Sequence, residues 1–288
     1  MGQRQGSPLT VSDYLNSITP VSGDARVYYG AAPSQWFDLF LPKAAGTAPL
    51  VILVHGGCWS DRAGAETVSQ NAADLAAHGV AVCSLEYRRV GEAGGGYPGT
   101  YLDLSAATDR LGVEASAHGI DLDRIVVVGH SAGGHLALWL AARHRLPAGS
   151  SLLGTSALPA RSVVVIAGPG DLRHHAGLLD VTCAGMATSA QVVGIPSPER
   201  RDPFADTSPA DLLPLGIRTI SVTGIFDDNW PPHVTARWVD AARAAGDDAG
   251  EVILADVGHF EVMDVRSPAW VMVRDCILAE VARFSNAT

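Results

Sequence analysis

The stretch around Ser131 limits the possible folds most strongly. Residues 124–128 form a β-branched run that is typical of a buried strand. A G-x-S-x-G motif follows at 129–133, and a run rich in leucine and alanine then predicts a buried helix up to about residue 145. A strand, a tight turn and a helix in this order are the context in which the serine of such a motif serves as a nucleophile.

The two glycines of the motif have a steric explanation. A serine whose hydroxyl projects from a sharp turn needs small neighbours, because the strand and the helix approach closely on either side of it. The N-terminus of the following helix also directs free N–H groups toward developing negative charge. Ser131 is therefore the candidate nucleophile; the alternative is a purely structural glycine-rich turn.

Strands and helices alternate along most of the chain. This order predicts an α/β fold with a mostly parallel central sheet and helices on both faces, in which ligands bind at the carboxyl ends of the strands. The first two strands are candidates for an antiparallel edge pair. Predicted strands span 25–29, 36–41, 50–55, 80–87, 124–128, 162–167, 217–223 and 250–255, and predicted helices span 65–78, 101–118, 132–145, 233–245 and 268–284.

The 288 residues are expected to form a single domain, 1–288, since α/β folds reach this length as one unit. Residues 1–22 are either a loose arm or contain a short helix at 11–15. From 171 to 215 the pattern weakens, with five prolines and no clear strand. A long segment of this kind is usually functional, and we interpret it as a small cap inserted over the strand ends.

Composition excludes several classes of protein. A hydrophobic content of 47% and a charged content of 17% indicate a globular chain, and a net charge of −10 disfavours nucleic acid or an anionic membrane as partner. The four cysteines form no C-x-x-C pair, so neither a zinc nor a redox site is indicated. No stretch approaches the roughly 18 apolar residues of a membrane span, and no signal core is seen, which predicts a cytoplasmic location.

A serine nucleophile needs a base and an acid partner. Of the ten histidines, His259 stands out because it follows the last predicted strand in the short loop 257–260. Two adjacent acids follow the preceding strand; Asp227 is the preferred partner and Asp228 the alternative. The chain order Ser–Asp–His is the one expected of an α/β-hydrolase.

A tetrahedral oxyanion needs fixed hydrogen-bond donors. The amide of Ala132, directly after the candidate nucleophile, is one. The sequence H-G-G-C-W at 55–59 is similar to the H-G-G-G loop that supplies the others, so Gly57 and Cys58 are the expected donors. Cys58 could instead be a nucleophile, but the pattern places no base for it.

These motifs together resemble the α/β-hydrolase superfamily, in particular the hormone-sensitive-lipase-like esterases and the arylformamidase (kynurenine formamidase) group. The resemblance runs from about residue 29 to the C-terminus. It rests on H-G-G-C-W, on Glu-Tyr-Arg at 86–88, on G-H-S-A-G-G at 129–134, on G-x-x-D-x-x-x-P at 224–231 and on G-H-F at 258–260.

The resemblance implies a serine hydrolase that acts on a small carboxylic ester through an acyl-enzyme, without a metal or organic cofactor. One alternative is a C–N hydrolase of aryl formamides, or an acyl-releasing or cyclising enzyme of secondary metabolism. A non-catalytic binding protein on this scaffold is a third interpretation. The oligomeric state is open, with a homodimer as one possibility. The predicted substrate-binding side chains, for which core packing is the alternative, are Trp59, Tyr97, Trp230 and Phe260.

Overall fold

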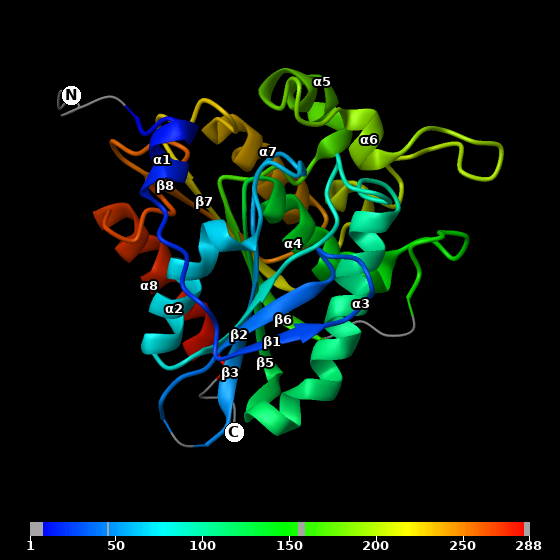
Figure 1. Ribbon diagram of the computed structural model, residues 1–288. Helices are drawn as coiled ribbons and strands as arrows, with labels where there is room; N and C mark the ends of the chain where they lie inside the picture. The colour runs from blue at the N-terminus through cyan, green and yellow to red at the C-terminus, as the bar shows by residue number, and fades with distance from the viewer. Residues whose placement is uncertain (1–7, 45, 155–158, 285–288) are drawn as a thin grey trace.

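Eight strands form one sheet in the computed structural model, which describes residues 8–44, 46–154 and 159–284 (Figure 1). Their order across the sheet is β1-β2-β4-β3-β5-β6-β7-β8. The pairs β1–β2 and β2–β4 are antiparallel, and every later pair is parallel. The expected antiparallel edge pair and the mostly parallel sheet are therefore confirmed. The strands are β1 (Ala25–Tyr28), β2 (Trp36–Phe40), β3 (Ala48–Val54), β4 (Ala81–Leu85), β5 (Ile120–His130), β6 (Ala160–Ile166), β7 (Arg218–Gly224) and β8 (Ala249–Leu254).

Four of the α-helices in the described ranges, α1, α5, α6 and α8, begin at a residue whose side chain caps the helix. Ser267 caps α8 with Pro268 at its first position, and the Asp171 side chain accepts the amide of His174 at the start of α5. The predicted helices 65–78 and 101–118 each contain a 3₁₀ turn, at the beginning of the first and at the end of the second. The helices are α1 (Val11–Ser17), η1 (Ala65–Val68), α2 (Ser69–Ala77), α3 (Gly99–Glu114), η2 (Ala115–His118), α4 (Ala132–Ala142), η3 (Arg143–Arg145), α5 (Leu172–Thr182), α6 (Ser189–Val193), η4 (Pro209–Leu212), α7 (Pro232–Ala244) and α8 (Pro268–Ala282).

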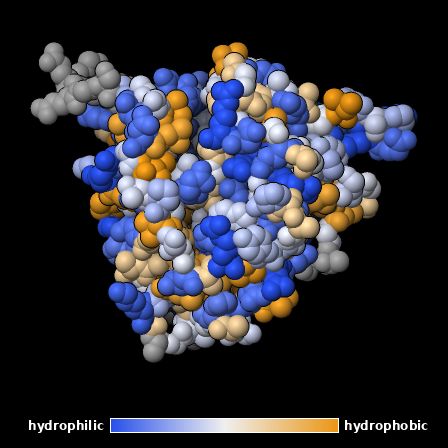
Figure 2. Space-filling model, viewed as in Figure 1, coloured by the Kyte–Doolittle hydropathy of each residue, from blue (hydrophilic) through white to orange (hydrophobic). Residues whose placement is uncertain are grey.

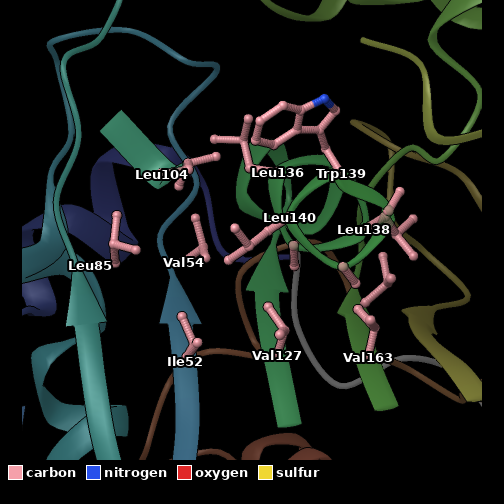
Figure 3. Close-up of a cluster of buried hydrophobic side chains, with 14 of the residues drawn as sticks. Ile52, Val54, Leu85, Leu104, Val127, Leu136, Leu138, Trp139, Leu140 and Val163 are labelled. Carbon is pink, nitrogen blue, oxygen red and sulfur yellow. The ribbon is translucent and has the colours of Figure 1, made fainter. Parts of the chain in front are cut away.

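Alternate side chains of the strands enter two separate cores. On β3, Leu50, Ile52 and Val54 pack in the core under α3, α4 and α7, whereas Val51 and Leu53 pack in the core under α1, α2 and α8. Figure 3 shows the first core, with leucines of α4 above the strands. A central sheet covered on both faces explains why its strands read as continuous apolar runs in the sequence.

Residues 171–215 contain α5, α6 and η4 and, among the residues that the structure describes, no strand. These helices lie at the same end of the molecule as α1 (Figure 1). The sequence pattern did not reveal these helices because α6 and η4 have only five and four residues, and α5, with 11 residues, contains the polar run Arg173–His175 and has no long apolar period. None of the helices in the described ranges combines the length and the apolar character that crossing a membrane requires.

Candidate active site

Ser131 occupies a strained turn between β5 and α4. Its backbone has φ 55° and ψ −122°, a conformation that costs a non-glycine residue about 1–3 kcal/mol. The turn needs both motif glycines, because a Cβ on Gly129 would lie 1.9 Å from the Gly133 oxygen and a Cβ on Gly133 would lie 2.1 Å from the Val54 oxygen. The steric reason predicted for these glycines is therefore visible in the backbone.

His259 and Asp227 meet at the carboxyl ends of the last two strands. The His259 ring uses Nδ1 to hydrogen-bond Oδ2 of Asp227, at 2.8 Å, and both side chains are buried. The other carboxylate oxygen accepts the amides of Asn229 at 2.9 Å and Trp230 at 2.8 Å. Asp227 is thus held in one rotamer against the ring, whereas the neighbouring Asp228 is exposed.

Ser131 and His259 line the same cavity, which has a volume of about 550 Å³ and lies within the ~300–1,000 Å³ range of ligand pockets. The rest of the wall comes from the segment 8–15, the loop after β3, the end of α5 with the turn after it, and the loop after β7, together with Thr67, His130 and Phe260. Figure 2 shows this hollow at the upper end of the molecule, with apolar side chains along the α1 side. The structure therefore brings the three predicted catalytic residues together, since Asp227 reaches the cavity through His259.

His130 is a residue that the sequence analysis did not assign to the site. Its Nε2 hydrogen-bonds the main-chain oxygen of His259 at 3.0 Å, and the two rings are 4.7 Å apart. Burial, together with the nearby His259, holds the pKa of His130 well below its usual value. A neutral His130 can donate from Nε2 to that carbonyl, which positions the loop that carries His259. His130 directly precedes Ser131 in the G-x-S-x-G motif, but this position indicates a contact with the His259 loop only once the fold is known.

The predicted oxyanion loop has an unusual backbone. Gly57, Cys58 and Trp59 have φ values of 103°, 54° and 55°. Gly57 and Cys58 line the cavity, and no hydrogen-bond acceptor for their amides is found among the described residues. Ala132 is buried at the first position of α4, where a helix leaves its N–H groups free.

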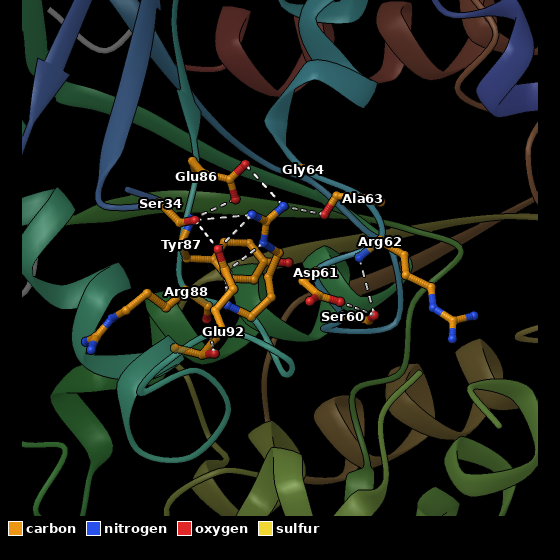
Figure 4. Close-up of polar contacts among 12 residues, drawn as sticks. Ser34, Ser60, Asp61, Arg62, Ala63, Gly64, Glu86, Tyr87, Arg88 and Glu92 are labelled. Atoms are coloured by element: carbon orange, nitrogen blue, oxygen red, sulfur yellow. Dashed lines mark hydrogen bonds and ion pairs between the residues drawn. The ribbon is translucent and has the colours of Figure 1, made fainter. Parts of the chain in front are cut away.

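A buried salt bridge between His55 and Glu86 supports the loop that carries Gly57 and Cys58. His55 Nε2 lies 2.8 Å from Glu86 Oε1, and Nδ1 lies 2.7 Å from the Gly56 oxygen. The other Glu86 oxygen accepts the amide of Ala65 at 2.9 Å and lies 3.5 Å from the Arg89 guanidinium. Figure 4 shows Glu86 within the polar contacts that join residues 86–92 to the loop 60–64. Burial alone would raise the pKa of Glu86, but the charges of His55 and Arg89 and these hydrogen bonds lower it below its usual value. Glu86 therefore stays ionised and fixes the strand end from which the oxyanion loop departs.

Three of the four aromatic side chains predicted to contact substrate do not line the cavity. Trp59 and Trp230 are almost fully buried, with ring centroids 6.3 Å apart. The Trp59 indole donates to Nδ1 of His135 at 3.2 Å, which directs it into the core. Tyr97 lies under the guanidinium of Arg200, 3.9 Å from the ring centroid, at a separate surface depression. Phe260 does line the cavity.

Cys58 and Cys183 form a disulfide. The sequence did not reveal it because 125 residues separate the two cysteines and only the tertiary fold brings α5 to the loop after β3. With its sulfur in this bond, Cys58 cannot act as a nucleophile. Cys83 is a buried free cysteine, and Cys276 is a half-buried free cysteine. Within the described ranges, no group of three or more His, Cys, Asp or Glu residues is arranged to hold a metal ion.

The mostly parallel sheet, the serine turn after β5 and the Asp227–His259 pair past β7 and β8 define the class of this protein as an α/β-hydrolase fold. The chain belongs to the BD-FAE family, whose family model matches residues 37–212. A truncated form of a carbohydrate esterase from gut microbiota has a similar structure, with a TM-score of 0.75 and 21% identity over 92% of this chain and 98% of that one. At this identity the likeness concerns the fold.

Curated relatives are similar over shorter stretches. The probable isoprenylcysteine alpha-carbonyl methylesterase ICMEL1 of Arabidopsis thaliana is 31% identical over 114 residues, which is 38% of this chain and 23% of the relative. The kynurenine formamidase avaC of Aspergillus versicolor is 37% identical over 99 residues, 32% of this chain and 34% of the relative. The match thus spans about a quarter to a third of the length of these relatives.

The buried Glu86 makes a testable contribution to stability. Glu86→Gln leaves the His55 ring without its anionic partner, and we expect unfolding free energy at pH 7 to fall by about 3–5 kcal/mol. Because the folded pKa of Glu86 is lowered from 4.5, its stabilisation is present above that pH and is lost as the pH falls through the folded value. Urea denaturation at pH 7 and at successively lower pH should show the difference from wild type shrinking below about pH 4.5.

The matched control is Glu199→Gln, which removes an exposed carboxylate and should change stability by less than about 0.5 kcal/mol. A Glu86→Gln protein as stable as wild type at pH 7 would show that the ion pair does not hold the loop.

Proposed function

We propose that this chain is a serine hydrolase that cleaves a carboxylic ester of a small molecule through an acyl-enzyme intermediate. The observation that carries the proposal is the 2.8 Å contact between His259 Nδ1 and Asp227, at the wall of the cavity that Ser131 also lines. A histidine held by a buried carboxylate is the base that a serine hydroxyl needs at neutral pH.

In the proposed mechanism, His259 Nε2 takes the proton of the Ser131 hydroxyl while the oxygen attacks the ester carbonyl. The Asp227 carboxylate holds the ring in the tautomer that leaves Nε2 free and stabilises the imidazolium that forms. The N–H groups of Gly57, Cys58 and Ala132 stabilise the oxyanion. His259 then protonates the leaving alcohol, and a water molecule, activated by the same histidine, releases the acid and restores Ser131.

Hydrolysis of an aryl formamide is the second candidate. The same three residues could open a C–N bond, because the oxyanion intermediate is similar and His259 could protonate an amine as well as an alcohol. The similarity to a protein named kynurenine formamidase favours this alternative, and the similarity to a protein named methylesterase favours the ester. Ester hydrolases and aryl formamidases share these motifs, so the two reactions are distinguished by the leaving group, an alcohol or an amine, that the enzyme accepts.

The wall formed by α1 favours a substrate with an apolar group. Leu9, Val11 and Leu15 line this side of the cavity. Val11 is 55% exposed and Leu15 39% exposed, so both offer surface that an alkyl or aryl chain can cover. The Tyr14 ring stacks on Phe260 at 5.2 Å and its hydroxyl donates to the Thr67 oxygen at 2.9 Å, which fixes α1 against the loop of His259.

We interpret residues 171–215 as a cap within a single domain, because the end of α5 contributes Thr182, and the turn after it contributes Met186, to the cavity wall. The homodimer stays a prediction. The cytoplasmic location also stays a prediction, although the Cys58–Cys183 disulfide favours an oxidising compartment, where such bonds persist.

The first prediction from this mechanism concerns the acid. Asp227→Asn should lower kcat for p-nitrophenyl acetate by about 10⁴-fold, because the asparagine amide no longer supports the required tautomer. The matched comparison is the adjacent Asp228, an exposed residue of the cavity wall. Its Asp228→Asn variant should keep kcat within about threefold of wild type, because Asp227 holds Nδ1 of His259. A large loss of kcat in Asp228→Asn would instead assign the role of the acid to Asp228.

Ser131→Ala should abolish turnover and leave the circular dichroism spectrum unchanged.

A substrate panel separates the candidate reactions. We expect kcat/KM for p-nitrophenyl acetate or octanoate to exceed that for N-formylkynurenine by more than about tenfold, which corresponds to about 1.4 kcal/mol in transition-state stabilisation. If kcat/KM for N-formylkynurenine were higher by orders of magnitude, the proposed ester hydrolysis would be wrong and C–N hydrolysis would take its place. Absence of a fluorophosphonate adduct on Ser131 would instead favour a non-catalytic binding protein.

The α1 wall should affect long acyl chains selectively. Leu15→Ala removes apolar contact surface, and we expect kcat/KM for p-nitrophenyl octanoate to fall about three- to tenfold while the acetate value changes less than about twofold. Leu102→Ala is the matched control, since Leu102 on α3 is also 39% exposed but lies away from the cavity. Equal effects on both esters would contradict a role of α1 in chain-length preference.

A further inference from the structure

The Cys58–Cys183 disulfide connects two segments of the cavity wall. Cys58 belongs to the loop after β3, and Cys183 is the fully buried residue that ends α5. Their Cα atoms are 5.5 Å apart. Cys58 itself lines the cavity, as does Thr182 next to the other cysteine. The bond therefore lies at the proposed catalytic centre and not at a remote surface.

Cys58 has fewer other restraints than the residues around it. Its φ of 54° is in the left-handed region that a residue with a side chain rarely adopts. Trp59, with a similar φ, is held by its indole bond to His135 and by its main-chain oxygen, which accepts the amide of Val90 at 2.7 Å. In contrast, no hydrogen bond of the Cys58 main chain is found in the described parts of the chain. A hydrogen bond from the Ser60 amide to the Gly57 oxygen, at 3.0 Å, closes the turn across Cys58 and Trp59. The disulfide is the contact of Cys58 itself that adds to this turn and ties it to the end of α5.

Two hydrogen bonds hold the other end of the bridge in place. Arg62, in the loop that follows Cys58, donates from Nη2 to the Gly185 oxygen at 2.9 Å. Thr182 donates from Oγ1 to the Asn229 oxygen at 3.2 Å, in the loop of the catalytic acid. The end of α5 is thus joined to both loops that flank Ser131, and a covalent bond to it gives the Cys58 amide a fixed support.

We propose that Cys183 is a positioning residue whose disulfide holds the Cys58 amide in the oxyanion hole, so that the hydrolase works at full rate only with this bond oxidised. The inference rests on the proposed function. Reduction by a dithiol transfers two electrons and two protons to the bridge, breaks the S–S bond, produces the Cys58 and Cys183 thiols and converts the dithiol to its own disulfide. Cys58 can then relax toward negative φ, which removes one oxyanion donor while the substrate cavity remains.

The test measures kcat and KM for p-nitrophenyl acetate with the full-length protein in its oxidised form, after reduction by dithiothreitol and after reoxidation. Iodoacetamide labelling with mass spectrometry reports the state of each cysteine. We expect kcat to fall about 10- to 100-fold on reduction, since one oxyanion donor is worth up to about 10³-fold, with KM changed less than about threefold, and to recover on reoxidation. Cys183→Ser should show the reduced-state kcat and no response to dithiothreitol.

The control is Cys276→Ser, which removes a free cysteine and should respond to reductant as wild type does. Melting temperatures measured in parallel identify a purely structural bond: a lower melting temperature with unchanged kcat well below it would overturn the positioning role. So would free Cys58 and Cys183 thiols in the oxidised, fully active protein. An oxidised wild type that hydrolyses no ester and forms no fluorophosphonate adduct would instead refute the proposed function, and the inference with it.

Discussion

The close approach of strand β5 and helix α4 is the constraint on which the site depends. A Cβ on Gly129 of β5 would lie 1.9 Å from the Gly133 oxygen of α4, and a Cβ on Gly133 would lie 2.1 Å from the Val54 carbonyl of the neighbouring strand β3. The turn can therefore form only where glycines leave these positions without side chains. This contact brings Ser131 directly beside the loop that leaves β3. The strain stored at Ser131 is sustained by the buried sheet beneath it, which is covered on both faces and has little freedom to relax.

Around this turn, each loop of the site is held by a buried polar contact. Glu86 holds the start of the oxyanion loop through His55, His130 holds the His259 loop, and main-chain amides hold Asp227. In the proposed mechanism, such contacts position the reacting groups before the substrate arrives, so little reorganisation is needed in the transition state. The disulfide extends the same arrangement to Cys58 and joins it to the end of α5.

The fold was largely predictable because its signals are local. Continuous apolar runs of four or five residues, such as 50–54 and 125–128, indicated buried parallel strands, and glycines and prolines marked helix boundaries such as the start of α8 at Pro268. The candidate residues Ser131, Asp227 and His259 were predictable because each follows a strand, and parallel strands bring their carboxyl ends to one edge. Trp59 and Trp230 were misassigned because an aromatic residue beside a motif has the same sequence signature whether it faces a cavity or the core.

The sequence by itself determined the alternation of strands and helices, the elbow and the order of its partners, because these depend on residue type and spacing over short ranges. Only the tertiary structure decided which side chains face the cavity, that α1 forms one of its walls, and that Cys58 meets Cys183 across 125 residues. Those outcomes depend on how distant segments pack. A local sequence pattern does not predict such packing, because the free energy of a long-range contact depends on both residues of the pair and not on either one alone.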